Sequence, residues 1–195
     1  MEIIHERAKL QLIDSDDVET LFSIVEGNRD IWAYLISKMD TAQDMQQYVQ
    51  KAIQGYGKGT QIPFVVVDQQ TNTIVGSTRL YNISVEDKTI ELGQTWYHPS
   101  VQRTSINTEC KYLLLQYAFE KLHMLRVQIK TDVRNEKAQR AIERLGAVKE
   151  GVLRNERKLP NGYVRDAVVY SIISSEWPGV KEQLLEKLEL YKEKL

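Results

Sequence analysis

The chain has 195 residues, of which 42% are hydrophobic and 27% are charged, as is typical of a folded globular protein with one domain. Its formal net charge of −1 and the absence of a basic stripe in the sequence argue against nucleic-acid binding, so we expect no nucleic-acid partner. The single cysteine excludes a disulfide within the chain and argues against a cysteine-based metal site. We see no signal-peptide core and no apolar run long enough to span a membrane, and we therefore expect a cytoplasmic protein.

The N-terminal part predicts one strand followed by helices. Residues 9–13 alternate as a strand does, and a helix starts at Ser15 with apolar residues at helical spacing. Residues 28–39 predict a short second helix. Thr41 with an aspartate three residues later resembles a helix N-cap, and the glycines of GYGKG end that helix.

The middle of the chain changes to strand periodicity. Residues 63–68, 73–83 and 89–98 predict three consecutive strands, the first two joined by the turn QQTN. A short polar loop then leads into a helix over residues 105–122. Because the first turn of a helix has unpaired N–H groups, such a strand–loop–helix junction is suited to bind an anion.

The C-terminal part continues with a strand over residues 125–132 and a helix over 135–146. Two further strands follow at 151–158 and 164–173, and a last helix runs from about 175 to 194. This order predicts an α/β fold with a mixed sheet, without the regular alternation of a doubly wound fold.

Three stretches carry a resemblance to a known family: IELGQTWYHPSVQRTSINTECKYLLLQYAFE, RVQIKTDVRNEKAQRAIERLGAVKEGVLR and NGYVRDAVVYSI. In this order they resemble the GCN5-related N-acetyltransferases (GNAT), and within them the ribosomal-protein N-terminal acetyltransferases (RimJ/RimL-like). The likeness covers residues 10–177. It implies one acetyltransferase domain over residues 1–195, with a mixed, mostly antiparallel sheet, flanking helices and a splayed central strand pair.

The resemblance implies acetyl-CoA as cosubstrate and no metal. The family's pyrophosphate-binding loop corresponds to residues 102–107, where Arg103 and Ser105 stand in place of glycines. Ser105 could cap the helix, give its hydroxyl to phosphate, or strain the loop through its Cβ. Asn135 matches a residue that contacts the pantetheine arm, although a plain helix N-cap explains it as well. The cofactor-binding residues implied are Thr95, Trp96, Tyr97, Gln102, Arg103, Thr104, Ser105, Ile106, Asn107 and Asn135.

The resemblance gives Glu91 as the general base, and a surface carboxylate on the same strand is the alternative. The proton donors of the family are missing, because Ala138 and Ile142 occupy their positions. Either Tyr97, Tyr163 or Tyr170 replaces them, or the thiolate leaves unassisted, or catalysis is weak.

The acceptor is expected between the first helices and the turn PNGY, lined by Trp32, Tyr34 and Tyr163. By resemblance we expect acetyl transfer to a primary amine, with a protein or peptide α-amino group as the favoured acceptor. One alternative is that the acceptor is a small-molecule amine such as a polyamine or an antibiotic. The other is that the chain is a non-catalytic acyl-CoA-binding or interaction protein. We expect no membrane partner, and a homo-oligomer is left open.

Overall fold

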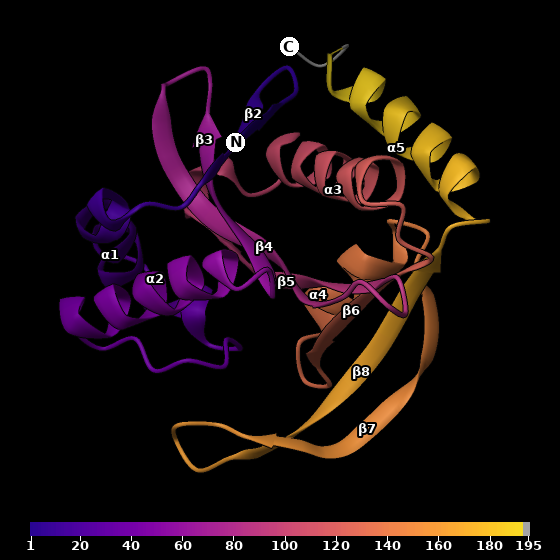
Figure 1. The fold of residues 1–195 in the computed structure, drawn as a ribbon. Helices are drawn as coiled ribbons and strands as arrows, with labels where there is room; N and C mark the ends of the chain where they lie inside the picture. Colours follow the sequence, from indigo (N-terminus) through magenta and orange to yellow (C-terminus); the bar gives the residue numbers. More distant parts are fainter. Residues whose placement is uncertain (193–195) are drawn as a thin grey trace.

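The structure is a computed structural model and describes residues 1–192 (Figure 1). Eight strands form one sheet in the order β1-β2-β3-β4-β5-β6-β8-β7. The strands are β1 (Glu2–Ile4), β2 (Ala8–Leu12), β3 (Gln61–Asp68), β4 (Thr73–Ser84), β5 (Thr89–Tyr97), β6 (Arg126–Asp132), β7 (Val148–Lys158) and β8 (Val164–Ile173).

The sheet is antiparallel except at its centre, where β5 and β6 run parallel. Their pairing covers only residues 89–91 and 126–128, after which the two strands separate. The expected mixed, mostly antiparallel sheet with a splayed central pair is therefore confirmed.

Helices cover both faces of the sheet. Figure 1 shows α1 and α2 on one side and α3 and α5 on the other. The helices are α1 (Val18–Glu26), α2 (Ala42–Gly57), α3 (Ile106–Gln116), α4 (Glu136–Glu143) and α5 (Trp177–Lys192).

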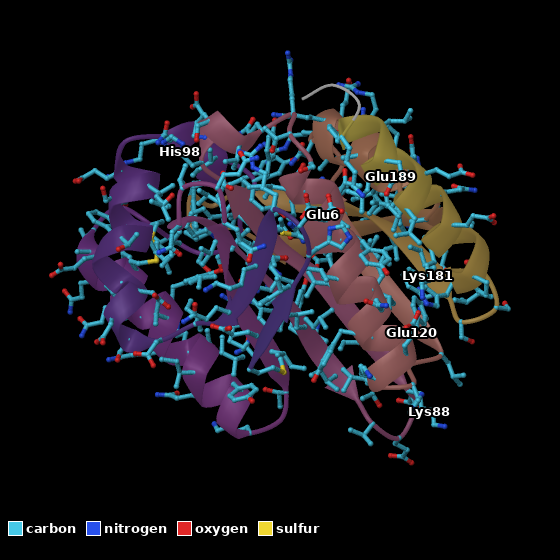
Figure 2. The ribbon with its side chains drawn as sticks, turned by 90° about the horizontal axis from the view of Figure 1, so that it is seen from above. Glu6, Lys88, His98, Glu120, Lys181 and Glu189 are labelled. Carbon is cyan, nitrogen blue, oxygen red and sulfur yellow. The ribbon has the colours of Figure 1, made fainter. Side chains whose placement is uncertain are left out.

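Each face has its own apolar cluster. Leu114 of α3 and Leu184 of α5 pack with Phe64 of β3 on one face, whereas Val65 faces α2 on the other. Successive residues of β3 therefore enter different cores, as the period of a strand requires. Trp177 and Lys181 of α5 both bond to Glu120, and Figure 2 shows Lys181 and Glu120 beside each other.

Three details differ from the sequence expectations. Strand β1 was not expected, and it lies at the sheet edge through pairing with β2. The expected helix over residues 28–39 was wrong in extent, because only the 3-10 turn Arg29–Trp32 forms there. The long helix over 105–122 ends as an α-helix at Gln116 and continues as a π-helical turn. The expected end of the last helix near residue 194 lies outside the described residues.

Candidate active site

The split between β5 and β6 leaves one edge of β5 without a strand partner. Beyond Glu91, β5 pairs only with β4, through Leu92, Gly93, Trp96 and Tyr97. Gln94 has a φ of 48° at a break in the β4–β5 register, and this bulge turns the strand away from β6. Backbone N–H and C=O groups on the open edge can therefore bind an extended ligand as another strand would.

The open edge leads into the loop before α3. The first intrahelical bond runs from the Glu109 N–H to the Ser105 carbonyl, at 2.9 Å, so the N–H groups of Asn107 and Thr108 have no partner inside the helix. A helix of this length also has a positive dipole end at its N-terminus. The loop and first turn thus present donors suited to a pyrophosphate group.

Ser105 does not have the local roles that the sequence suggested. Its φ of −65° and ψ of −23° are ordinary helical values, so its Cβ causes no backbone strain, and its side chain makes no capping bond. The hydroxyl instead donates to Oε1 of Glu109 at 2.7 Å. The strained position is Arg103, which has a φ of 65°.

Glu109 connects this loop to the N-terminal hairpin. Its buried carboxylate accepts bonds from the backbone N–H groups of Arg7 and Ala8, both at 2.8 Å, in addition to the Ser105 hydroxyl. A buried carboxylate with several donors is a rigid anchor, because leaving any of them unpaired is costly. The loop before α3 is therefore fixed by bonds to the N-terminal hairpin.

Helix α4 begins on the other side of the split. Asn135 caps it, since its Oδ1 accepts a bond from the Ala138 N–H at 3.0 Å, so the capping interpretation is confirmed. Lys137 reaches across the split and donates to Oε1 of Gln102 at 2.8 Å. This bond connects the first turn of α4 to the loop, and contact of Asn135 with a cofactor stays a prediction.

Glu91 lies where the β5–β6 pairing ends, on the face opposite α3. It is only 2% exposed, so the alternative of a surface carboxylate is wrong. The Tyr81 hydroxyl donates to its Oε1, and the Asn82 and Gln128 amides donate to Oε2 at 3.1 and 3.3 Å. Burial and the negative charge of Glu91 raise the pKa of Tyr81 far above its usual value, so Tyr81 remains a donor.

Charged side chains extend from Glu91 along the same face. The Lys130 ammonium lies 3.3 Å from Glu91 and 3.5 Å from Glu156, and Arg165 donates to Glu156 at 2.9 Å. Burial alone would raise the pKa of Glu156, but its cationic neighbours, Arg165 first, outweigh burial and lower it. The face of β5, β6, β7 and β8 that carries Glu91 therefore bears a connected network of charged side chains.

Comparisons with known proteins decide the family. A sequence model of the acetyltransferase (GNAT) domain matches residues 7–148, more than half of the chain. The chain belongs to the GNAT family.

Individual relatives agree with this assignment. The Bacillus subtilis (strain 168) protein named "Putative ribosomal N-acetyltransferase YdaF" is 34% identical over 109 residues, which are 56% of this chain and 58% of that protein. The matched segment thus spans less than two thirds of that relative.

Solved GNAT structures show the same fold. A crystal structure of a "putative acetyltransferase" from T. thermophilus is 32% identical, covers 96% of both chains and has a TM-score of 0.85. The ribosomal-protein-S5-alanine acetyltransferase of Vibrio fischeri has a TM-score of 0.76 at 22% identity, with 91% of this chain and 98% of that chain covered. At that identity the second likeness shows the fold alone.

The usual GNAT proton donors are absent from this chain. Ala138 and Ile142 of α4 carry no donor, and Ile142 is buried in the core. The Tyr170 hydroxyl already donates to Glu143 at 3.0 Å, and burial together with Glu143 raises its pKa to about 12. The Tyr97 side chain is partly buried, but its hydroxyl is closed off from solvent near Cys110, and burial raises its pKa well above the usual value. Neither of these two expected substitutes is therefore an exposed donor at the split.

The three expected acceptor residues do not form one group. Tyr34 and Tyr163 meet at Arg134, whose guanidinium carbon lies 5.8 and 3.7 Å from the two ring centroids. Arg134 is itself held by the buried Asp132. Trp32 lies elsewhere, edge-on to Trp96 at 5.4 Å in the core under α2. The loop after α1 and the turn before β8 are thus connected through Arg134.

Lys111 is a site residue that sequence reasoning missed. Its Nζ donates to Oγ1 of Thr95 on the separated part of β5 at 2.9 Å, and burial lowers its pKa to about 8. The signal was available, because a lysine stands inside the apolar run CKYLLL. Tyr81 was also missed, and nothing local marks it, since its contact with Glu91 depends on the register of β4 and β5.

The statements on metal-binding groups and membrane-spanning helices that follow apply to residues 1–192. Within this range no group of three or more His, Cys, Asp or Glu residues could hold a metal ion. Over the same range, no helix has the length and apolar character that crossing a membrane requires.

Proposed function

We propose that this GNAT protein transfers the acetyl group of acetyl-CoA to a primary amine, and that the acceptor is the α-amino group of a protein or peptide. The observation that carries the proposal is the position of the buried Glu91 carboxylate at the point where β5 leaves β6. A base thus lies next to the open strand edge along which this family's thioester cofactor would bind.

The donor groups of the structure fit acetyl-CoA. The open edge of β5 suits the amide-bearing pantetheine arm, and the unpaired N–H groups of α3 suit its pyrophosphate. When bound, the cofactor supplies a thioester carbonyl that is activated for attack. The residues proposed to hold it are Thr95, Trp96, Tyr97, Gln102, Arg103, Thr104, Ser105, Ile106, Asn107 and Asn135.

Glu91 would remove the proton from the attacking amine, directly or through one water. An α-amino group has a pKa of about 8, so at pH 7 roughly one molecule in ten is already the neutral nucleophile, and the carboxylate accepts the proton that the amine loses as it attacks. Tyr81 and Asn82 fix the carboxylate by donating to both of its oxygens. A backbone N–H on the open edge of β5 would donate to the oxyanion that forms on the carbonyl.

The choice of a protein α-amino group is supported by one relative. The name of the Bacillus subtilis protein refers to ribosomal N-acetylation. A cytoplasmic site of action would suit such acceptors and stays a prediction, as does the oligomeric state.

A binding and transfer experiment tests the proposal. Calorimetric titration with acetyl-CoA, with ATP as control, measures cofactor binding. Mass spectrometry then follows acetylation of a peptide with a free N-terminus, the same peptide with a blocked N-terminus and an internal lysine, and spermidine.

Acetylation of the free peptide alone would support the proposal. Acetylation of spermidine alone would replace it with a small-molecule function, and cofactor binding without transfer to any amine would favour a non-catalytic role. No binding at millimolar acetyl-CoA would contradict the enzyme as a whole.

A further inference from the structure

Arg79 of β4 is a buried cation without an acidic partner. Its side chain is 4% exposed, and none of the ion pairs formed by residues 1–192 includes it. Only its Nη1 is bonded, to Oε1 of Gln61 at 2.9 Å, whereas Nε and Nη2 have no partner. A buried guanidinium with two unused donors is costly unless something else pairs with them.

Nε and Nη2 form the edge of arginine that binds carboxylates through two parallel bonds. The same chain uses this edge twice. Arg7 binds Asp68 through Nε and Nη2 at 3.0 and 2.7 Å, and Arg134 binds Asp132 through the same atoms at 2.9 and 2.8 Å. Arg79 presents the identical edge with no carboxylate on it.

The surroundings of Arg79 hold this edge in place and add further unused polar groups. The Tyr48 ring lies under the guanidinium, 4.4 Å from its carbon to the ring centroid. The Tyr48 hydroxyl and the Trp96 indole N–H are also buried without partners. Trp32 packs edge-on against both rings at 5.4 Å, so these groups belong to one cluster under α2.

Arg79 lies on the same face of the sheet as Glu91. Residues 79 and 81 are two apart on β4, and Tyr81 donates to Glu91. In the sheet register Arg79 pairs with Gly93 and Tyr81 pairs with Glu91, so Arg79 and Glu91 are diagonal neighbours. Diagonal neighbours have Cβ atoms about 7–8 Å apart. Gly93 between them carries no side chain, and the Tyr81 ring occupies the space over it, so this ring is among the side chains that must move to admit a ligand.

We propose that the unpaired edge of Arg79 binds a carboxylate of the acceptor, so that the preferred acceptor is a peptide whose first residue is Asp or Glu. The amine would then lie at Glu91 and the side-chain carboxylate at Arg79. Both nitrogens are closed off from solvent, so neighbouring side chains must shift when the acceptor enters. This inference rests on the proposed function and specifies its substrate class.

Paired peptides provide the test. Peptides that begin with Glu or Gln, and with Asp or Asn, are otherwise identical, and their kcat/KM values are compared with acetyl-CoA as donor. We expect wild type to favour the acidic member of each pair by at least about 10-fold, a factor equal to roughly 1.4 kcal/mol. Arg79→Met should reduce this ratio to near one, and Arg79→Lys, which keeps the charge but loses the two-bond edge, should give an intermediate ratio.

Lys181→Met is the matched control, because it removes a cation that pairs with Glu120 on the opposite flank (Figure 2). It should leave the ratio unchanged. The melting temperature of Arg79→Met separates a binding role from a structural one. A binding role predicts no loss of stability, because an unpaired buried charge is removed, whereas a marked loss with an unchanged ratio would overturn the inference.

A second readout does not depend on turnover. Trp32 and Trp96 lie in the Arg79 cluster, so tryptophan fluorescence can follow titration with the Glu and Gln peptides, and with free glutamate and glutamine, in the presence of CoA. Stronger binding of the carboxylate member in wild type, lost in Arg79→Met, supports the subsite. Equal binding overturns it.

The two proposals can fail separately. Equal acetylation of acidic and amide peptides would overturn the carboxylate subsite and leave peptide acetylation standing. If no peptide is acetylated although acetyl-CoA binds, the peptide acceptor is wrong, and the glutamate titration alone decides the role of Arg79.

Discussion

The two sides of β5 differ in almost every property. Toward α3, Ile90 and Leu92 pack into the large apolar cluster, and Lys111 is a buried cation bonded to Thr95. On the opposite side, Glu91 is held by hydroxyl, amide and ammonium groups. Because strand side chains alternate with a period of two, one strand can present an apolar wall to its core and a base to its substrate. In the proposed mechanism, β5 therefore contributes to the core on one face and supplies the base on the other.

The largest expected effect is the loss of turnover when the proposed base on the polar face of β5 is removed. Glu91→Gln keeps the size of the side chain but cannot accept the amine proton, so we expect turnover to fall by about 10²–10⁴-fold. Acetyl-CoA affinity should stay within about two-fold, because the carboxylate does not belong to the loop that we propose binds the cofactor. Steady-state kinetics with a free-N-terminus peptide and calorimetry measure the two effects.

Glu150→Gln is the control for this change. Glu150 lies on the same face but pairs with Arg126, which lowers its pKa to about 2. Turnover in this variant should stay near wild type. Full activity in Glu91→Gln would exclude Glu91 from the mechanism.

On the apolar face of β5, replacing the buried Lys111 should increase the stability of the protein. Burial lowers the pKa of Lys111 from 10.5 to about 8, so the folded state disfavours the charged amine. Lys111→Met should therefore increase the free energy of unfolding at pH 7 by up to about 3 kcal/mol. Urea denaturation of both proteins measures this difference.

The pH dependence of that gain follows from the sign of the shift. Below about pH 8 both folded and unfolded Lys111 are protonated and the penalty is complete. Between about pH 8 and 10.5 the unfolded state holds the extra proton, so wild type gains stability relative to Lys111→Met as the pH rises. A stability difference that does not change over this window would contradict a buried ammonium.

A smaller effect on stability and on cofactor affinity is expected at Glu109, which connects the N-terminal hairpin to the loop before α3. Glu109→Gln replaces a buried carboxylate that accepts from Arg7, Ala8 and Ser105, so an amide N–H will face a donor. We expect a loss of about 1–3 kcal/mol in stability and a weaker affinity for acetyl-CoA. Glu189→Gln on the exposed surface of α5 (Figure 2) should change neither quantity. If calorimetry finds the same affinity for acetyl-CoA in Glu109→Gln, the bonds of Glu109 are not needed to hold the loop for binding.

The smallest effect concerns the backbone of the loop. Arg103 has a φ of 65°, which glycine adopts without strain, so Arg103→Gly should increase stability by about 1 kcal/mol. Arg103→Ala removes the same charge but keeps the strained Cβ. Thermal denaturation should separate the two variants, and any shared loss of acetyl-CoA affinity reports the charge. Equal melting temperatures would indicate that the loop relaxes around residue 103.

Sequence periodicity was sufficient for the order of the elements from β2 onward, except between α1 and α2, where a helix was expected and a 3-10 turn forms. The hairpin of β3 and β4, the capped start of α2 at Thr41 and the glycine after α4 depend on local chemistry, and all of them formed where expected. The helix expected over residues 28–39 was wrong because Trp32 suggests an apolar helix face. In the structure its indole N–H donates to the Ser37 carbonyl, and the segment after the 3-10 turn is a loop. β1 is three residues long and gives too little pattern to recognise.

Less of the site could be predicted from the sequence, because its side-chain contacts depend on the register in which β5 pairs with β4 and β6. The loop and Glu91 could be located by resemblance, but the burial of Glu91 depends on Tyr81 and Gln128 from two different neighbouring strands. Arg79 reads locally as one polar residue in an alternating strand. Only the pairing of β4 with β5 and the position of α2 show that it is buried without a partner.

The burial of Cys110 has a practical consequence for enzymology. It is the only thiol of the chain, it has no solvent exposure, and burial raises its pKa to about 12. A thiolate is the reactive form, so this side chain should be inert toward disulfide reagents while the fold is intact. A colorimetric thiol reagent added during turnover will therefore count released coenzyme A without a background from the protein, and a slow signal without substrate will report unfolding around α3.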